Sequence, residues 1–403
     1  MKESGLTQAV PFRVPPTPAT LRPVQNEEWP LMITSAKLSG YRGFAEFSLD
    51  KLATINLLVG KNNSGKSSIL EALHLLSSGP DLNSLWRIIA HRGEQTVPEF
   101  LPGRAIQQEA DISHLFTGHR IELGSQFTIA ASLDDGSENT ITFRTDLTNE
   151  NENLGHLAQF IPADEIKSPI VLRISGTPSI TILPLPLTKQ STLRFDVLQQ
   201  ATAFAVNVSK KTRNPSQYVA TESLSVMELL NLWNSISLTS EEDSVVKILQ
   251  VLEPRIDRIA AISGPFINSG NPSRGGFVVR LAGPEQRIPI GSFGDGIWRV
   301  FALAVALSRS KDSILLVDEI DTGLHHTVMV DMWKFVHQAA KKLNVQVFAT
   351  THSYDCVHSL ANICEENDAN EIAIHRIETG SANSITFTSG EVEAAANNDI
   401  EVR

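Results

Sequence analysis

The chain has 403 residues, of which 41% are hydrophobic, and a formal net charge of −11 at pH 7. This length allows two or three domains, or one large domain with insertions, and the apolar content is enough to fill a core. The acidic balance argues against a protein that is basic throughout and binds nucleic acid over its whole surface, but it leaves room for a local basic face.

Cysteine usage and hydropathy indicate where the protein resides. The two cysteines, Cys356 and Cys364, predict no disulfide framework, and we expect a reducing, cytoplasmic compartment. No apolar run approaches the roughly 18 residues of a membrane span, so we expect no membrane partner. Residues 1–30 lack the apolar segment of a signal peptide and are rich in proline, which predicts a flexible arm.

The first ordered elements are predicted to be strands. Two of them, 32–37 and 45–49, flank the sequence YRGF at 41–44. A third is predicted at 55–59, where isoleucine, leucine and valine form an apolar run. Apolar residues at helical spacing over 69–76 predict a helix directly afterwards.

The sequence between this strand and this helix fits the phosphate-binding pattern G-x-x-x-x-G-K-[ST] in full. Backbone N–H groups of such a turn, together with the helix N-terminus, form a nest for anions. Lys66 would bring a positive charge to the outer phosphates, and the Ser67 hydroxyl is a suitable Mg²⁺ ligand. The predicted nucleotide-binding residues of this loop are Gly60, Asn62, Asn63, Ser64, Gly65, Lys66, Ser67 and Ser68.

The middle of the chain predicts mainly hairpins and two helices. Residues 77–120 are expected to be irregular, because Gly79-Pro80 and Pro102-Gly103 interrupt them. The later elements are predicted as paired strands 127–133 and 140–144, paired strands 170–174 and 179–183, helices at 222–235 and from 246 to 256, and paired strands 277–281 and 287–290.

Regular alternation of helix and strand returns in the last third. Helical stripes at 297–307 and 328–339 alternate with buried strands at 313–317 and 345–349. This order predicts a parallel sheet. Ligands bind at the carboxyl ends of such strands, which is where an acidic pair and the sequence TTHS at 350–353 fall.

The acidic pair after the strand 313–317 resembles a Walker B motif. Asp318 would hold Mg²⁺, directly or through water, and Glu319 would polarise the attacking water. An acidic pair after a buried strand is also common without this role. His352 would hydrogen-bond the γ-phosphate or order the water, and its alternative role is packing or capping.

Motif spacing separates classes of nucleotide-hydrolysing proteins. Lys66 and Asp318 lie roughly 250 positions apart, a gap that requires a large insertion if both serve one nucleotide. Such an insertion is typical of the ABC/SMC class, where a signature helix precedes the Walker B strand. The sequence GSFGDG at 291–296 opens the helix before the Asp318 strand, which is the expected place.

These motifs together resemble the ATPases of the OLD/RecF/SMC-like branch of the ABC class. The matching sequences are KLSGYRGF (37–44), VGKNNSGKSS (59–68), SFGDGIWRVFALAVAL (292–307), LLVDEIDTGLHH (315–326) and ATTHS (349–353). They cover both ends of the core, whereas residues 87–265 match only in general layout.

The resemblance implies further site residues. It implies a nucleotide contact for Arg42, a D-loop position at the dimer seam for Asp321, and the role of switch histidine for His352. It also implies that a signature region made of Ser292, Gly294, Asp295 and Gly296 reaches the γ-phosphate bound by another protomer. Two registers stay open: Ser292-Phe293-Gly294 fits Ser-x-Gly outright, whereas Gly296 as the signature glycine leaves the contact to backbone N–H groups. The Q-loop glutamine cannot be placed, and Gln107 and Gln108 are candidates by position alone.

The implied fold is α/β: a P-loop NTPase of the ABC type, an ATPase head with an antiparallel β subdomain and a helical insertion. The expected segments are the arm at 1–30, the first part of the core at 31–86, a β and helical insertion lobe at 87–265, and the second part of the core at 266–403.

The implied function is ATP hydrolysis with Mg²⁺ by two or more associated heads. OLD-type nucleases carry a Toprim domain after the ATPase, and the chain after His352 is too short for one, so we expect a separate effector, a nuclease or toxin of anti-phage or mobile-element defence. A RecF-like repair ATPase that binds DNA and a scaffold that binds ATP without turnover remain the alternatives.

Overall fold

We analysed a computed structural model, which describes residues 32–79, 81–96, 108–148, 170–177, 180–188, 190–208, 216–262, 276–283, 286–364 and 371–397. The predicted N-terminal arm at 1–30 and the Q-loop candidate Gln107 lie outside these residues.

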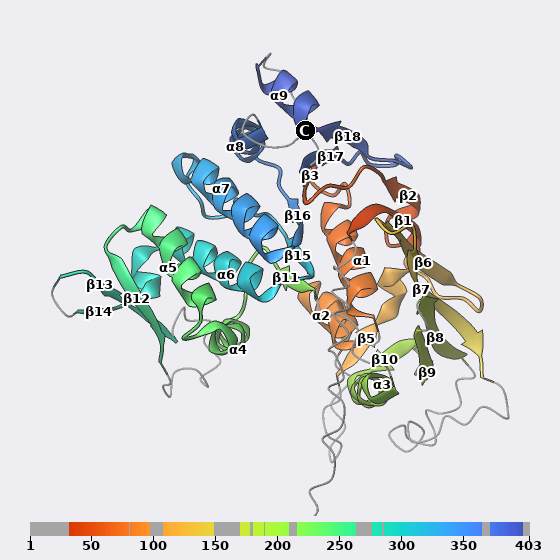
Figure 1. The fold of residues 1–403 in the computed structure, drawn as a ribbon. Coiled ribbons are helices and arrows are strands. Elements are labelled where there is room, and N and C mark those ends of the chain that lie inside the picture. The colour runs from red at the N-terminus through yellow and green to blue at the C-terminus, as the bar shows by residue number, and fades with distance from the viewer. Residues whose placement is uncertain are drawn as a thin grey trace, which may run out of the picture.

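A six-stranded sheet runs through the middle of the molecule in the order β11-β15-β16-β3-β17-β18 (Figure 1). Its first five strands pair in parallel, and β18 pairs antiparallel to β17. The parallel sheet predicted from the C-terminal third is therefore confirmed, and β3 joins it from the N-terminal part. The strands are β3 (Ile55–Val59), β11 (Gln217–Val219), β15 (Ile314–Val317), β16 (Gln346–Thr350), β17 (Ile372–Arg376) and β18 (Ile385–Thr388).

Both faces of this sheet are covered, because apolar side chains alternate between two hydrophobic cores. Leu57 of β3 and Leu315 of β15 belong to one core, whereas Leu58 and Leu316 belong to the other. Side chains that follow one another along a strand point to opposite faces, which explains why β15 is apolar throughout and β3 is apolar except for the buried Asn56.

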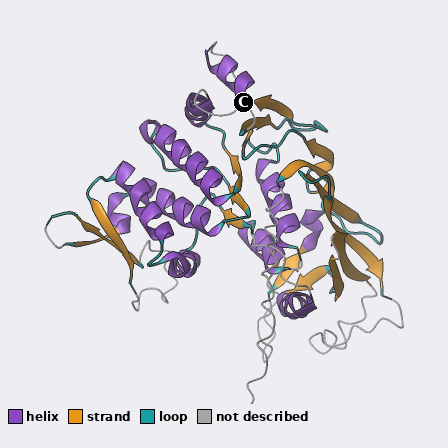
Figure 2. Cartoon of the chain, in the orientation of Figure 1, coloured by secondary structure: helices purple, strands orange, loops and turns teal. Residues whose placement is uncertain are grey.

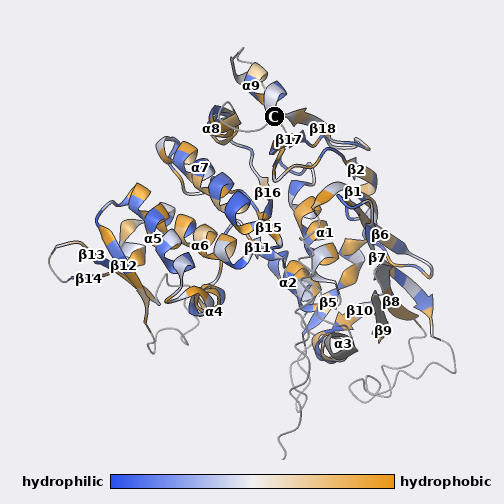
Figure 3. Cartoon of the chain, viewed as in Figure 1, coloured by the Kyte–Doolittle hydropathy of each residue, from blue (hydrophilic) through white to orange (hydrophobic). Residues whose placement is uncertain are grey.

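The first core lies under the helices drawn to the left of the sheet in Figure 1. Figure 3 shows apolar and polar residues alternating around α7, as expected for a helix with one buried face. The elements of this side are α4 (Val226–Ile236), α5 (Ser240–Leu252), α6 (Asp295–Arg309), α7 (His326–Leu343), α8 (Tyr354–Cys364) and the small sheet of β12 (Ile256–Ala261), β13 (Phe277–Leu281) and β14 (Arg287–Pro289), with the 3₁₀ turn η4 (Ile290–Phe293) before α6. The terminal helix α9 (Ser389–Asn397) packs on α8.

The second core lies between the central sheet and an antiparallel sheet of order β2-β1-β6-β7-β8-β9 (Figure 2). Two strands of this sheet precede the phosphate loop and four follow it. The boundary expected at residue 87 between the first part of the core and the insertion lobe therefore divides one sheet. The division of the chain into these segments stays a prediction. The strands of this sheet are β1 (Ile33–Tyr41), β2 (Phe44–Leu49), β6 (Gln126–Leu133), β7 (Glu138–Leu147), β8 (Ile170–Thr177) and β9 (Ile180–Pro186); α1 (Lys66–Ser78) and α3 (Phe195–Val208) also contribute to this core.

Two expectations about the fold are wrong. The helix predicted from 246 to 256 is α5, which covers Ser240–Leu252, and Ile256 already begins β12. Residues 77–120 are not irregular throughout: they contain α2 (Asn83–His91), β4 (Gln95–Thr96), β5 (Glu109–Asp111) and the 3₁₀ turn η1 (Ile112–Leu115). Leu85, Ile88 and Ile89 bury the apolar side of α2, and β5 is completed by β4 and by β10 (Thr192–Arg194), which comes from distant sequence. Strands of two or three residues leave no periodic pattern, so tertiary contacts decide their formation.

Within the described residues, no helix is both long and apolar enough to cross a lipid bilayer.

Candidate nucleotide-binding site

The phosphate loop follows β3 and ends at the first turn of α1. Gly60 has φ 141° and Gly65 has φ 98°, a region that side-chain-bearing residues rarely adopt. A Cβ on Gly60 would lie 2.4 Å from the Ile377 carbonyl oxygen, and one on Gly65 would lie 2.3 Å from the Phe44 ring. Both glycines are therefore required by close packing as well as by backbone geometry. Asn62 and Asn63 are exposed at the tip of the loop.

Lys66 begins α1 and bends back over the loop. Its Nζ donates to the carbonyl oxygens of Gly60 at 2.8 Å and Lys61 at 2.9 Å. Burial lowers the pKa of this amine, while the carboxylates of Glu319 and Asp318 oppose the shift. The loop thus holds a cation within reach of the acidic pair.

Asp318 lies at the end of β15 and accepts hydrogen bonds from three hydroxyl groups. Its Oδ1 accepts from Ser67 Oγ at 3.1 Å and from Thr350 Oγ1 at 2.6 Å. Its Oδ2 accepts from Thr221 Oγ1 at 3.2 Å. The predicted pairing of Ser67 with Asp318 is thus present in space, although the two residues are 251 positions apart.

Glu319 follows directly in a left-handed conformation, with φ 47°. Its N–H donates to Thr350 Oγ1 at 2.8 Å, which helps to hold this uncommon geometry. One carboxylate oxygen lies 3.3 Å from Nδ1 of His352, whose side chain is 50% exposed. The structure therefore brings the expected base and the expected switch histidine together beside the phosphate loop.

The predicted signature residues lie at the start of α6. Gly294 is the N-cap of this helix, and Asp295 and Gly296 form its first turn. Ser292 belongs to the preceding 3₁₀ turn and is exposed. This arrangement presents the backbone of Gly294 to Gly296 at a helix N-terminus, as the second register of the signature requires, but it does not decide between the two registers.

The loop after Glu319 packs against this helix. A Cβ on Gly296 would lie 3.2 Å from the Gly323 carbonyl oxygen. Asp321 in the same loop accepts a hydrogen bond from Thr351 Oγ1 at 2.6 Å. The expected D-loop, the signature region and the end of β16 are therefore neighbours within one protomer.

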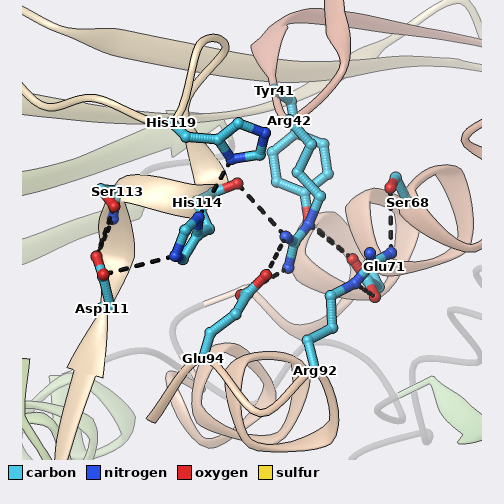
Figure 4. A network of polar contacts seen from close by, with 10 residues as sticks. All are labelled: Tyr41, Arg42, Ser68, Glu71, Arg92, Glu94, Asp111, Ser113, His114 and His119. Atoms are coloured by element: carbon cyan, nitrogen blue, oxygen red, sulfur yellow. Dashed lines mark hydrogen bonds and ion pairs between the residues drawn. The ribbon is translucent and has the colours of Figure 1, made fainter. Parts of the chain in front are cut away.

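Arg42 occupies a buried ionic network rather than an open position, as Figure 4 shows. Its guanidinium lies 2.9 Å from Glu71 of α1 and 2.7 Å from Glu94. Burial lowers the pKa of Arg42, but Tyr41, Glu94 and Glu71 together raise it above its ordinary value. A nucleotide contact would require this side chain to leave two carboxylates, so that contact stays a prediction.

Ser68 faces the same network from the first turn of α1 (Figure 4). Its Oγ accepts a hydrogen bond from Arg92 at 3.1 Å, and Arg92 also contacts Glu71 at 2.6 Å. The sequence KLSGYRGF thus stabilises the phosphate loop and the helix that follows it: Phe44 packs on Gly65, and Arg42 pairs with Glu71 of α1.

Three residues of this site were missed in the sequence. Thr350 precedes the predicted switch histidine, and its place at a strand end was an available signal. Arg299 is the one charged residue in the buried stretch 297–307, which was also a signal. Thr221 follows the three-residue strand β11 and carries no motif, so only the fold brings it to Asp318.

The residues present fit a magnesium nucleotide. Ser67, Asp318 and Thr221 supply hydroxyl and carboxylate oxygens, which are the ligands that Mg²⁺ prefers. Ser64 Oγ is buried in the loop with no hydrogen-bond partner among the described residues. A further polar group at the loop would satisfy this atom.

Comparisons with known proteins agree with this geometry. A family model described as "AAA domain, putative AbiEii toxin, Type IV TA system" matches residues 55–355. The chain is 25% identical over 374 residues to an ATP/GTP phosphatase of Helicobacter pylori, covering 84% of this chain and 90% of that protein. It is also 38% identical over 69 residues to the DNA replication and repair protein RecF of Francisella tularensis, covering 17% of this chain and 20% of RecF.

Solved structures of SMC heads are similar to this chain at lower sequence identity. An SMC head bound to the C-winged helix domain of ScpA gives a TM-score of 0.48 at 15% identity and covers 88% of this chain and 97% of that one. The SMC head domain from Thermotoga maritima gives a TM-score of 0.42 at 12% identity, with coverage of 88% and 98%.

Proposed function

The chain belongs to the family of AAA domains that the matching model describes, and we propose that it is an ABC-type ATPase that binds ATP with Mg²⁺ and hydrolyses it. The contact between Ser67 and Asp318 is the observation that carries this proposal. It joins the end of the phosphate loop, which follows β3, to the acidic pair that follows β15. The parallel pairs of β3 with β16 and of β16 with β15 bring these two positions together. A hydroxyl and a carboxylate in this arrangement serve the metal in phosphate-loop ATPases.

The proposed roles follow from the position of each side chain. Lys66 would bind the outer phosphates, while Ser67 and Asp318 would hold Mg²⁺, which supplies charge neutralisation at the transferred phosphoryl group. Glu319 would accept the proton of the attacking water, and His352 would orient that water or the γ-phosphate. The catalytic contribution is positioning and electrostatic stabilisation.

We further propose that ATP binds between two heads. The signature residues Ser292, Gly294, Asp295 and Gly296 would meet the nucleotide held by the partner, and Asp321 would lie at the seam. Support comes from the exposed position of Ser292, Gly294 and Asp295 at the start of α6. A helix N-terminus favours a phosphate through its N–H groups and dipole.

The biological role that we propose is regulation of a separate effector, a nuclease or toxin, in cytoplasmic anti-phage or mobile-element defence. The motif resemblance to OLD-type ATPases supports this proposal. The description of the family, which names a putative toxin of a toxin–antitoxin system, is consistent with it.

Hydrolysis of ATP by the purified chain tests the enzymatic proposal. Wild type is expected to release phosphate, and Glu319→Gln to lower the rate about 100-fold or more because it removes the base. The same variant should keep ATP binding and accumulate as an ATP-bound dimer or larger oligomer, measured by light scattering. The exposed carboxylate variant Glu138→Gln is the matched control and should behave as wild type.

Two results would contradict these roles. Full activity of Glu319→Gln would remove Glu319 as the base. A wild type that binds ATP without turnover and without a change in mass would leave only an ATP-dependent scaffold.

A RecF-like, DNA-binding repair ATPase is the second candidate, favoured by the local similarity to RecF. It predicts that duplex DNA stimulates hydrolysis and that added salt weakens the effect. Hydrolysis rates that do not change with DNA would reject this candidate and leave the ATPase proposal intact.

A further inference from the structure

Arg299 is the one charged residue in the buried, otherwise apolar stretch 297–307 of α6. It lies near the start of α6, is 4% exposed, and has the buried residues Trp298 and Val300 as chain neighbours. Removing a guanidinium from water is unfavourable unless its N–H groups find good acceptors. The identity of those acceptors therefore indicates what the side chain does.

Among the described residues, Arg299 donates four hydrogen bonds, and each goes to a backbone carbonyl oxygen. Nη1 donates to Ala220 at 2.6 Å and to Thr221 at 3.1 Å. Nη2 donates to Asp318 at 2.6 Å and to Glu319 at 3.0 Å. The planar guanidinium thus spans the ends of β11 and β15, one nitrogen on each chain segment.

The four carbonyls belong to the segments that carry the proposed metal and base residues. Thr221 and Asp318 meet through their side chains at 3.2 Å, and Glu319 has its left-handed backbone between two anchors, Thr350 on its N–H and Arg299 on its carbonyl. A small shift of the guanidinium would therefore change the direction of the Asp318 and Glu319 side chains.

The same helix begins at the signature region. Gly296 lies one turn before Arg299 and packs on Gly323, in the loop that follows Glu319. The N-terminal turn of α6 is consequently connected to Asp318 and Glu319 in two ways. Gly296 packs on the loop that follows Glu319, and Arg299 donates hydrogen bonds to the carbonyl oxygens of Asp318 and Glu319.

We propose that Arg299 is a positioning residue that couples the location of the α6 N-terminal turn to the proposed divalent-cation site of Ser67 and Asp318, which Thr221 adjoins. This inference rests on the proposed ATPase function. Its consequence is that a contact of the signature turn with a partner's nucleotide changes the metal site of its own protomer.

The direct test is the gain in ATP affinity that Mg²⁺ produces. Calorimetric titration with ATP in EDTA and then in saturating Mg²⁺ gives this gain without any need for turnover. Arg299→Met and Arg299→Lys are expected to reduce it about tenfold, the effect of losing a group that orients a metal ligand. Lysine should not restore it, because a point charge cannot span both strand ends. Affinity in EDTA, which depends on the phosphate loop, should change less than about twofold.

Arg309→Met is the matched control, since Arg309 ends the same helix and is exposed. It should keep the full gain. Thermal unfolding of each variant shows whether it is folded, and if Arg299→Met does not fold, Arg299→Lys carries the measurement. A folded Arg299 variant with an unchanged gain would overturn the positioning role, as would an equal loss in EDTA and in Mg²⁺.

Coupling to the signature turn is tested by Gly296→Ala, whose added Cβ must displace the turn or the Gly323 carbonyl. Gly296→Ala should lower the Mg²⁺ gain in wild type and add nothing in the Arg299→Lys background, a non-additivity that marks coupled sites. No effect of Gly296→Ala, or equal effects in both backgrounds, would overturn the coupling. A wild type that binds no ATP would instead refute the proposed function.

Discussion

Replacement of Arg42 by methionine distinguishes a supporting role from a nucleotide contact. Arg42 is 5% exposed and pairs with Glu71, which is 2% exposed, and with Glu94, which is 13% exposed. Breaking a buried ion pair by removing one partner costs about 3–5 kcal/mol. Glu71 would keep Arg92 at 2.6 Å, so we expect the lower end, about 3 kcal/mol.

Thermal unfolding with and without Mg²⁺–ATP measures both roles. With an unfolding entropy of about 2.1 cal/mol/K per residue over 403 residues, a loss of about 3 kcal/mol lowers the Tm by about 4 °C. ATP at about 100 times its Kd adds about 2.7 kcal/mol of stability. If Arg42 only supports α1, the variant has a lower Tm but the same ATP-dependent increase. Arg42→Lys should lose less, because it keeps a charge near both carboxylates.

The exposed variant Arg144→Met serves as the control and should leave both measurements unchanged. An Arg42→Met variant that keeps the wild-type Tm and loses the increase with ATP would refute the supporting role. That pattern would make Arg42 a nucleotide ligand whose carboxylate contacts contribute little.

Two further predictions concern the surroundings of the phosphate loop. Burial, with Arg87 adding to it, lowers the pKa of His74 to about 4, and burial lowers the pKa of His375 to about 3. The unfolded chain takes up these protons below about pH 6.5, so stability should fall by about 3 kcal/mol in total between pH 6.5 and 5, measured by urea unfolding; a flat profile would contradict this. Gly65→Ala should lose about 3 kcal/mol, from its positive φ and its clash with an aromatic ring, and should bind ATP weakly. Gly390→Ala, which meets no atom within 4 Å, is its control, and equal effects of the two changes would refute the packing argument.

Local patterns predicted the elements that carry their own signals. The phosphate loop needs only a strand, two glycines and a helix start, all of which adjoin in the sequence. β15 and the middle of β16 (347–349) are continuously apolar because helices and a second sheet cover both faces, and these apolar runs and their order were sufficient to predict the two parallel strands. Side chains at their carboxyl ends, Asp318 and His352, could therefore be placed at one edge in advance.

Other parts of the site depend on tertiary contacts that no pattern encodes. β11 has three residues and gains its place only by pairing with β15, so Thr221 could not be predicted beside Asp318. The same reason explains the wrong expectation for residues 77–120, where β4 and β5 have two and three residues. The Q-loop glutamine could not be predicted either, because Gln108 was a candidate by position alone. In the structure, the backbone carbonyl of Gln108 accepts a hydrogen bond from the Phe195 N–H at 3.0 Å.

Arg42 and Arg299 are both buried, and their partners show why residue type alone did not define their roles. Arg42 pairs with carboxylates, so its contribution is largely a charge that balances Glu71 and Glu94, and another cation can replace part of it. Arg299 pairs with four carbonyl oxygens on two segments, so its contribution is the shape of the guanidinium. In the sequence, both residues are arginines beside apolar residues, and nothing there distinguishes their partners. Their partners are set by the fold: α1 reaches Arg42 because β1 and β3 belong to sheets on either side of one core, whereas the ends of β11 and β15 reach Arg299 because parallel strands end at one edge.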